Sequence, residues 1–102
     1  MEAAYHYESK DKPEVEKLLE DEFFKRLGPI DREAKLLGTK RDSGFYLYVK
    51  AASADKFAEA QRKITESKIP FVKLAGDEEQ QVFDAIRKEE EEAAEGMGAI
   101  FG

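Results

Sequence analysis

Apolar and polar residues alternate in the opening stretch of this chain, and apolar residues recur at helical spacing in three longer stretches. The alternation indicates a half-buried strand at residues 1–8, and short apolar stretches predict three more strands, at residues 34–39, 45–51 and 71–74. The helical spacing indicates amphipathic helices, expected at residues 11–27, 53–68 and 77–95. The predicted order is therefore strand, helix, strand, strand, helix, strand, with a further helix at the C-terminus.

This order predicts an α+β fold of the ferredoxin-like βαββαβ type, in which two βαβ units interleave in one sheet. Right-handed crossovers place two helices on one face of a four-stranded antiparallel sheet, with the first and third strands adjacent in its centre. With 102 residues, of which 41% are hydrophobic, the chain can fill one core. We expect one domain over residues 1–95, including the C-terminal helix 77–95, and a flexible, apolar, Gly-rich tail at residues 96–102.

Capping residues set the expected helix ends. Asp11 followed by Glu14 forms a start of the capping-box type, and Gly28 before a proline ends the first helix. Ser53 is placed to cap the second helix. The third helix starts at Asp77.

Charge is divided unevenly along the chain. Residues 1–76 carry 15 Lys and Arg against 14 Asp and Glu, a net of +1, whereas residues 77–95 carry two against nine, a net of −7. The second half of the third helix is polar on all sides and cannot pack on a core, so we expect it to extend into solvent and to fray beyond Ile86.

Several classes of catalytic and metal site are excluded by the residues present. The chain has no Cys, which excludes disulfides, Cys-ligated zinc and a thiolate nucleophile. His6 is the single histidine and no HExxH motif exists, while Ser43 lacks the GxSxG context of a hydrolase. The acidic run 89–92 lacks the loop of a calcium site. We therefore expect a non-enzyme with no metal and no cofactor.

Composition indicates the setting of the protein. No uncharged apolar run approaches the ~20 residues of a spanning helix, and the N-terminus has no apolar signal segment. We expect a soluble cytoplasmic protein without a membrane partner. Sixteen Glu and 12 Lys with no Asn is the direction in which thermophile proteins shift, so the composition is thermophile-like and archaeal-like.

The sheet face opposite the two helices is the first candidate surface. If Phe45, Leu47 and Val49 face the core, alternation places other side chains on the opposite face. These candidate binding residues are His6, Tyr46, Tyr48 and Lys50. A basic hairpin beside them could contact phosphates, through Arg32, Lys35, Lys40 and Arg41.

Aromatic side chains and a cation in the middle of a sheet can stack nucleic-acid bases. The placement resembles that in RNA-recognition-motif proteins, whose RNP1 sequence is matched here at Gly44-Phe45. The chain departs from that motif at Ser43, Tyr46 and Lys50. RNA binding is thus one hypothesis for this face, and no DNA binding is expected. The competing hypothesis is that the third helix folds back and covers Tyr46 and Tyr48.

The C-terminal residues are the second candidate surface. Met97, Ile100 and Phe101 are badly placed for the core, and an acidic helix that ends in apolar residues can bind the groove of a partner. A terminus without a partner is the simpler alternative. The sheet edges near Leu36 and Phe71 carry few blocking residues, which favours homodimerisation.

Two further families have a similar order of elements. The chain resembles the ACT family, whose paired domains bind amino acids, although residues 9–12 replace its Gly-rich loop. Residues 2–95 are also similar to the C-terminal domain of the alpha subunit of translation initiation factor 2, a docking domain. The sequence favours a small non-catalytic docking or dimerisation domain with a protein partner or a second copy. RNA binding and small-ligand regulation are the alternatives.

Overall fold

The computed structural model describes the backbone of residues 1–101 and the side chains of residues 1–93. Its elements are β1 (Glu2–Tyr7), the 3-10 turn η1 (Ser9–Asp11), α1 (Lys12–Leu19), α2 (Glu22–Leu27), β2 (Ile30–Glu33), the 3-10 turn η2 (Ala34–Leu37), β3 (Phe45–Lys50), α3 (Ala54–Glu66), β4 (Val72–Lys73) and α4 (Gly76–Phe101). The fold is of the α+β class.

The strands form one four-stranded sheet in the order β2-β3-β1-β4, and every neighbouring pair is antiparallel. This confirms the expected four-stranded antiparallel sheet with the first and third strands in its centre. Those two strands pair along their whole length, from Glu2 opposite Lys50 to Tyr7 opposite Phe45. The edge strand β4 is short and contains two residues.

The single helix predicted for residues 11–27 is wrong, because the chain forms α1 and α2 with a break at Glu20 and Asp21. The Asp21 carboxylate accepts a hydrogen bond from the Phe23 backbone N–H at 3.0 Å, so it caps a new helix. Gly28 ends α2 in the left-handed conformation, with a φ of 73°, as the sequence indicated.

The strand predicted at residues 34–39 is also wrong. The strand lies earlier, at Ile30–Glu33, and residues 34–37 form a 3-10 turn. Ala34 is buried while Leu36 is 69% exposed. In a strand these two side chains would lie on the same face of the sheet, so their different burial agrees with a turn. The Ala34 backbone N–H donates to the Gly44 carbonyl, which closes the loop between β2 and β3.

The two faces of the sheet pack against different helices. On one face, side chains of β1 and β3 join Val15, Phe24, Ala60 and Ile64 from α1, α2 and α3 in one apolar cluster. On the other face, Ala4, Tyr46 and Tyr48 join side chains of α4 in a second cluster, at Val82, Phe83 and Ile86. The expected alternation along β3 is thus confirmed.

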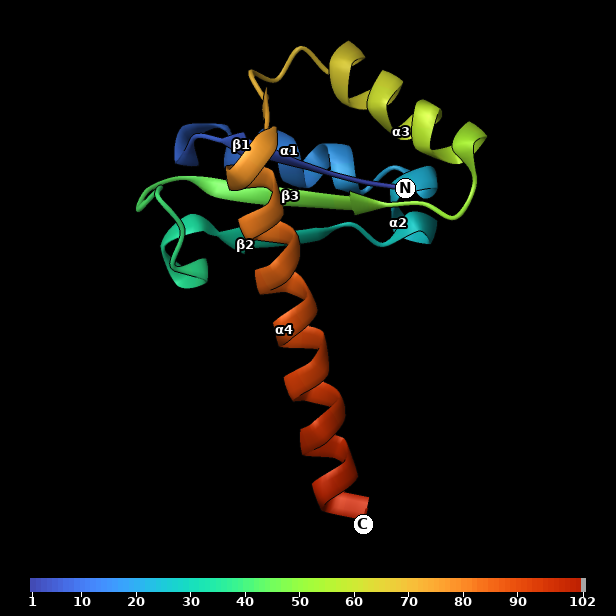
Figure 1. Cartoon of the computed structure of the whole chain (residues 1–102). Helices are drawn as coiled ribbons and strands as arrows, with labels where there is room; N and C mark the ends of the chain where they lie inside the picture. The colour runs from blue at the N-terminus through green and yellow to red at the C-terminus, as the bar shows by residue number, and fades with distance from the viewer. Residues whose placement is uncertain (102) are drawn as a thin grey trace.

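The longest helix crosses the sheet and continues well beyond it (Figure 1). The backbone is helical from Gly76 to Phe101, whereas we expected fraying beyond Ile86. Side chains of residues 94–102 lie outside the described part of the chain, so the flexible tail proposed for residues 96–102 stays a prediction.

Candidate interaction surfaces

The sheet face predicted to be open is covered by α4. Of the candidate binding residues, His6 is 3% exposed, Tyr46 1% and Tyr48 5%. The hypothesis that the C-terminal helix folds back over Tyr46 and Tyr48 is therefore the one that the structure bears out. Neither tyrosine ring presents a face on which a base could stack in this conformation.

Three apolar side chains hold α4 on the sheet. Val82, Phe83 and Ile86 are buried, and the Phe83 ring meets Tyr48 edge to face with centroids 5.7 Å apart. Burial of such a side chain is worth about 1.5–3 kcal/mol, so lifting α4 from the sheet loses this stabilisation at all three residues, and the conformational entropy of the released segment offsets only part of the loss. RNA binding on this face would first have to meet that cost.

A polar network surrounds this apolar contact. The Tyr48 hydroxyl donates to the Glu2 carboxylate, which also accepts from Arg87 of α4. Burial raises the pKa of Tyr48, and the neighbouring Glu2 carboxylate raises it further. Tyr46 pairs its hydroxyl with the Thr39 hydroxyl at 2.5 Å, and burial likewise raises its pKa. Both phenols are therefore held neutral as structural groups.

His6 is buried against the loop that precedes β3 and forms a hydrogen bond with it. Its Nε2 lies 2.9 Å from the Ser43 carbonyl oxygen, so that nitrogen is the donor of the ring. The imidazole also meets Tyr46 with ring centroids 5.6 Å apart.

The basic hairpin is partly engaged by acids of α4. Arg41 Nε donates to Glu78 at 2.6 Å, and Arg32 Nε donates to Glu89 at 3.0 Å. The hydrogen bond to Glu78 raises the pKa of Arg41. The other two predicted members, Lys35 and Lys40, are exposed. Two of the four cations of the hairpin thus pair with acidic residues of α4.

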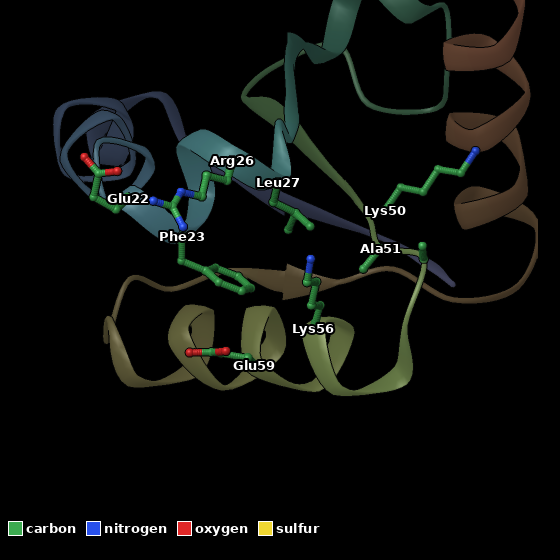
Figure 2. Close-up of a pocket in the computed structure, with 9 residues that line it drawn as sticks. Glu22, Phe23, Arg26, Leu27, Lys50, Ala51, Lys56 and Glu59 are labelled. Carbon is green, nitrogen blue, oxygen red and sulfur yellow. The ribbon is translucent and has the colours of Figure 1, made fainter.

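Lys50 is exposed at the end of β3 and does not join the tyrosines. Lys50 is one of the residues that line a pocket with Phe23 and Lys56, and Figure 2 shows its side chain pointing away from those two residues. The four predicted sheet-face residues are therefore three buried side chains and one exposed lysine.

The C-terminal half of α4 carries the second candidate surface. The described side chains at Glu90, Glu91, Glu92 and Ala93 are all exposed. The predicted recognition residues Met97, Ile100 and Phe101 belong to the same helix by backbone, and their side chains lie outside the described residues. Their role stays a prediction.

Sequence reasoning missed a charged cluster that joins α1 to β2. The Tyr7 hydroxyl donates to Asp31 Oδ1 at 2.7 Å, and Lys12 pairs with the other Asp31 oxygen. Lys12 Nζ also lies 4.4 Å from the centre of the Phe45 ring. Burial raises the pKa of Tyr7, and its hydrogen bond to Asp31 adds to the effect. No spacing in the sequence links these residues, since they meet only through the sheet.

Metal binding and membrane crossing find no support in the residues that the structure describes. Among them no three His, Asp or Glu side chains converge as a metal site would require. Within the same part of the chain, no helix combines the length and apolarity needed to cross a bilayer.

Comparison with protein-family models, with curated proteins and with solved structures finds no match for this chain.

Proposed function

We propose that this protein is a non-catalytic docking domain whose partner-binding element is the C-terminal half of α4, residues 88–101. The observation that supports this most is the division of α4. Its first half is buried on the sheet at Val82, Phe83 and Ile86, whereas its described side chains from 90 to 93 are exposed. The strand order and antiparallel pairing also agree with the ferredoxin-like topology that the sequence predicts.

The anchored half makes a projecting helix feasible. An isolated helix of this length is marginal in water, because the first turn must form before any later turn gains from it. Here the packed residues 82–86 supply that nucleus, and ion pairs from Arg87 to Glu2 and from Glu89 to Arg32 extend it. The 15 residues that follow Ile86, up to Phe101, then extend the helix by about 23 Å.

The residue types along this half indicate the chemistry of the partner. Residues 89–92 are four consecutive glutamates, and Met97, Ile100 and Phe101 recur at the i, i+3, i+4 spacing of a helix that docks in a groove. The partner surface that suits this pattern is an apolar groove bordered by Lys and Arg. A second copy of the same chain suits it less, because the net charge of −6 makes two copies repel each other.

The test is affinity capture from a lysate of the source organism, with and without nuclease. Three forms of the chain are compared: the unaltered protein, the double variant Ile100→Asp with Phe101→Asp, and the control Leu36→Asp. The control replaces an exposed apolar side chain, 69% accessible, in η2 and outside the proposed binding element. We expect proteins that resist nuclease to be retained by the unaltered chain and the control, and lost by the double variant.

Two results would contradict the proposal. Equal retention of the same proteins by all three forms would place the binding surface elsewhere. Retention of RNA, or of proteins that disappear with nuclease, would favour the sheet face after displacement of α4.

A further inference from the structure

A pocket opens between α2, the end of β3 and the start of α3, on the side of the sheet that α4 does not cover (Figure 2). Its volume is about 550 Å³. Pockets that bind small molecules span roughly 300–1,000 Å³, so this one is large enough for a ligand the size of an amino acid or a small aromatic acid.

The inner wall of the pocket is apolar and partly accessible. Phe23 and Leu27 of α2 are half-buried, and Ala51 at the end of β3 is buried behind them. Lys63 Nζ lies 5.6 Å from the centre of the Phe23 ring and pairs with Asp21 at 3.4 Å. The aromatic wall is a surface on which a planar or branched apolar group can pack.

Three cations are among the residues that line the pocket, and Lys50 is the one whose side chain points away from the Phe23 ring in Figure 2, which leaves Lys56 and Arg26 beside the wall. Lys56 projects from α3 between Phe23 and Leu27 in the view of Figure 2, and Arg26 stands on the other side of the Phe23 ring. Among the described residues neither makes an ion pair within 4.0 Å, whereas the neighbouring Glu59 is paired with Arg62 at 3.7 Å. Lys56 also belongs to the first turn of α3, where the helix dipole adds positive potential.

We propose that this pocket binds a small organic monocarboxylate with an aromatic or branched apolar body. The carboxylate pairs with Lys56, and the apolar body packs against Phe23 and Leu27. Two acidic residues at the rim, Glu22 and Glu59, disfavour polyanions such as nucleic acid, which leaves a single negative charge as the best match. This inference rests on the pocket alone and is independent of docking through α4.

The test is an NMR titration of the full-length protein with phenylacetate, using phenylacetamide as the neutral probe of the same shape. We expect phenylacetate to shift the backbone amides of residues 23–27 and 51–56. We also expect phenylacetamide to bind about three- to tenfold more weakly, since it lacks the charge that Lys56 attracts.

Variants separate the site from general attraction to the surface. Lys56→Gln should weaken phenylacetate binding about three- to tenfold and bring its affinity close to that of the amide. Lys25→Gln removes a neighbouring cation of α2 that does not line the pocket, and it should leave the affinity unchanged. Equal affinity for the two probes would overturn the proposal. So would phenylacetate shifts that stay at full size in Lys56→Gln or that fall outside the pocket.

Discussion

Gly44 lies immediately before β3 with a φ of +79°, and it packs against the imidazole of His6. A Cβ built on this residue would stand 2.5 Å from His6 Nε2 and 2.6 Å from the Tyr7 carbonyl oxygen. Gly38 has a similar φ of +68° but open space around it. The two glycines therefore separate the cost of backbone strain from the cost of a steric clash.

We predict that Gly44→Ala destabilises the protein by at least about 2 kcal/mol, because it adds the clash to the strain of a left-handed residue. Gly38→Ala should cost about 1–2 kcal/mol, from the strain alone. Urea unfolding of both variants followed by circular dichroism measures the difference. Equal losses would mean that the loop before β3 relaxes freely around the new methyl group.

The four tyrosines make stability depend on alkaline pH. Burial raises the pKa of Tyr5, Tyr7, Tyr46 and Tyr48 above the ordinary value of 10.0. Above pH 10.0 the unfolded chain therefore releases phenolic protons that the folded chain retains, so the free energy of unfolding falls as the pH rises. Below pH 10.0 this contribution to stability is fully present.

The expected result is that tyrosinate absorbance and the loss of circular dichroism appear together, in one transition well above pH 10.0. Tyr48→Phe removes one of the shifted groups, so the stability of that variant should fall less steeply with pH. It should cost about 1 kcal/mol at neutral pH through the lost hydrogen bond to Glu2. Tyrosinate that forms near pH 10.0 in a chain with native circular dichroism would contradict the burial of these phenols.

At the scale of elements, the two halves of the helix α4 differ in character. Its first half stabilises the fold and its second half is exposed. Ile86 is 2% exposed where α4 packs on the sheet, whereas Glu91, five residues later, is exposed.

We predict that Ile86→Ala lowers the free energy of unfolding by about 2–5 kcal/mol, because it leaves a cavity between α4 and the sheet. Glu91→Ala should change it by less than about 0.5 kcal/mol. Thermal unfolding of both variants provides the comparison. A small effect of Ile86→Ala would show that α4 is not packed on the sheet in solution.

Removal of the C-terminal residues tests the same division. A chain that ends at Glu92 keeps the buried residues Val82, Phe83 and Ile86. It also keeps the ion pairs of Arg87 and Glu89. Its unfolding midpoint should therefore stay within a few degrees of the full chain, while the helical circular dichroism signal falls. Loss of folding in this truncated chain would mean that residues 93–102 are structural rather than available for docking.

At the scale of the whole molecule, α4 makes the shape elongated. The extents are 46 × 30 × 26 Å and the Cα radius of gyration is 14.2 Å, against about 13 Å for a compact domain of this length.

Small-angle scattering should show this excess. The full chain should give a larger radius of gyration than the chain that ends at Glu92, because the removed residues lie at the far end of the helix. The same radius for both chains would indicate that the C-terminal residues fold back on the domain.

The sequence by itself determined the class of the fold and the positions of its central strands. Residues 1–8 alternate and residues 45–49 form a continuous apolar run, and both strands are buried on their two faces, against α1, α2 and α3 on one face and against α4 on the other. Sequence also indicated the helix ends at Gly28 and Ser53, since these caps act on the nearest backbone groups. The sequence analysis misplaced the second strand and missed the break between α1 and α2, where single hydrogen bonds outweigh a short apolar pattern.

Only the tertiary structure decided which surface is free. The same apolar residues of α4 were compatible with an open sheet face and with a covered one, because periodicity gives the direction of a side chain but not its neighbour. Packing of Phe83 on Tyr48 decides the question, and the charged contacts of Glu2 with Arg87 and of Arg32 with Glu89 complete the cover. These contacts join residues 35 or more positions apart, so they depend on how α4 crosses the sheet, and no local pattern in the chain records that geometry.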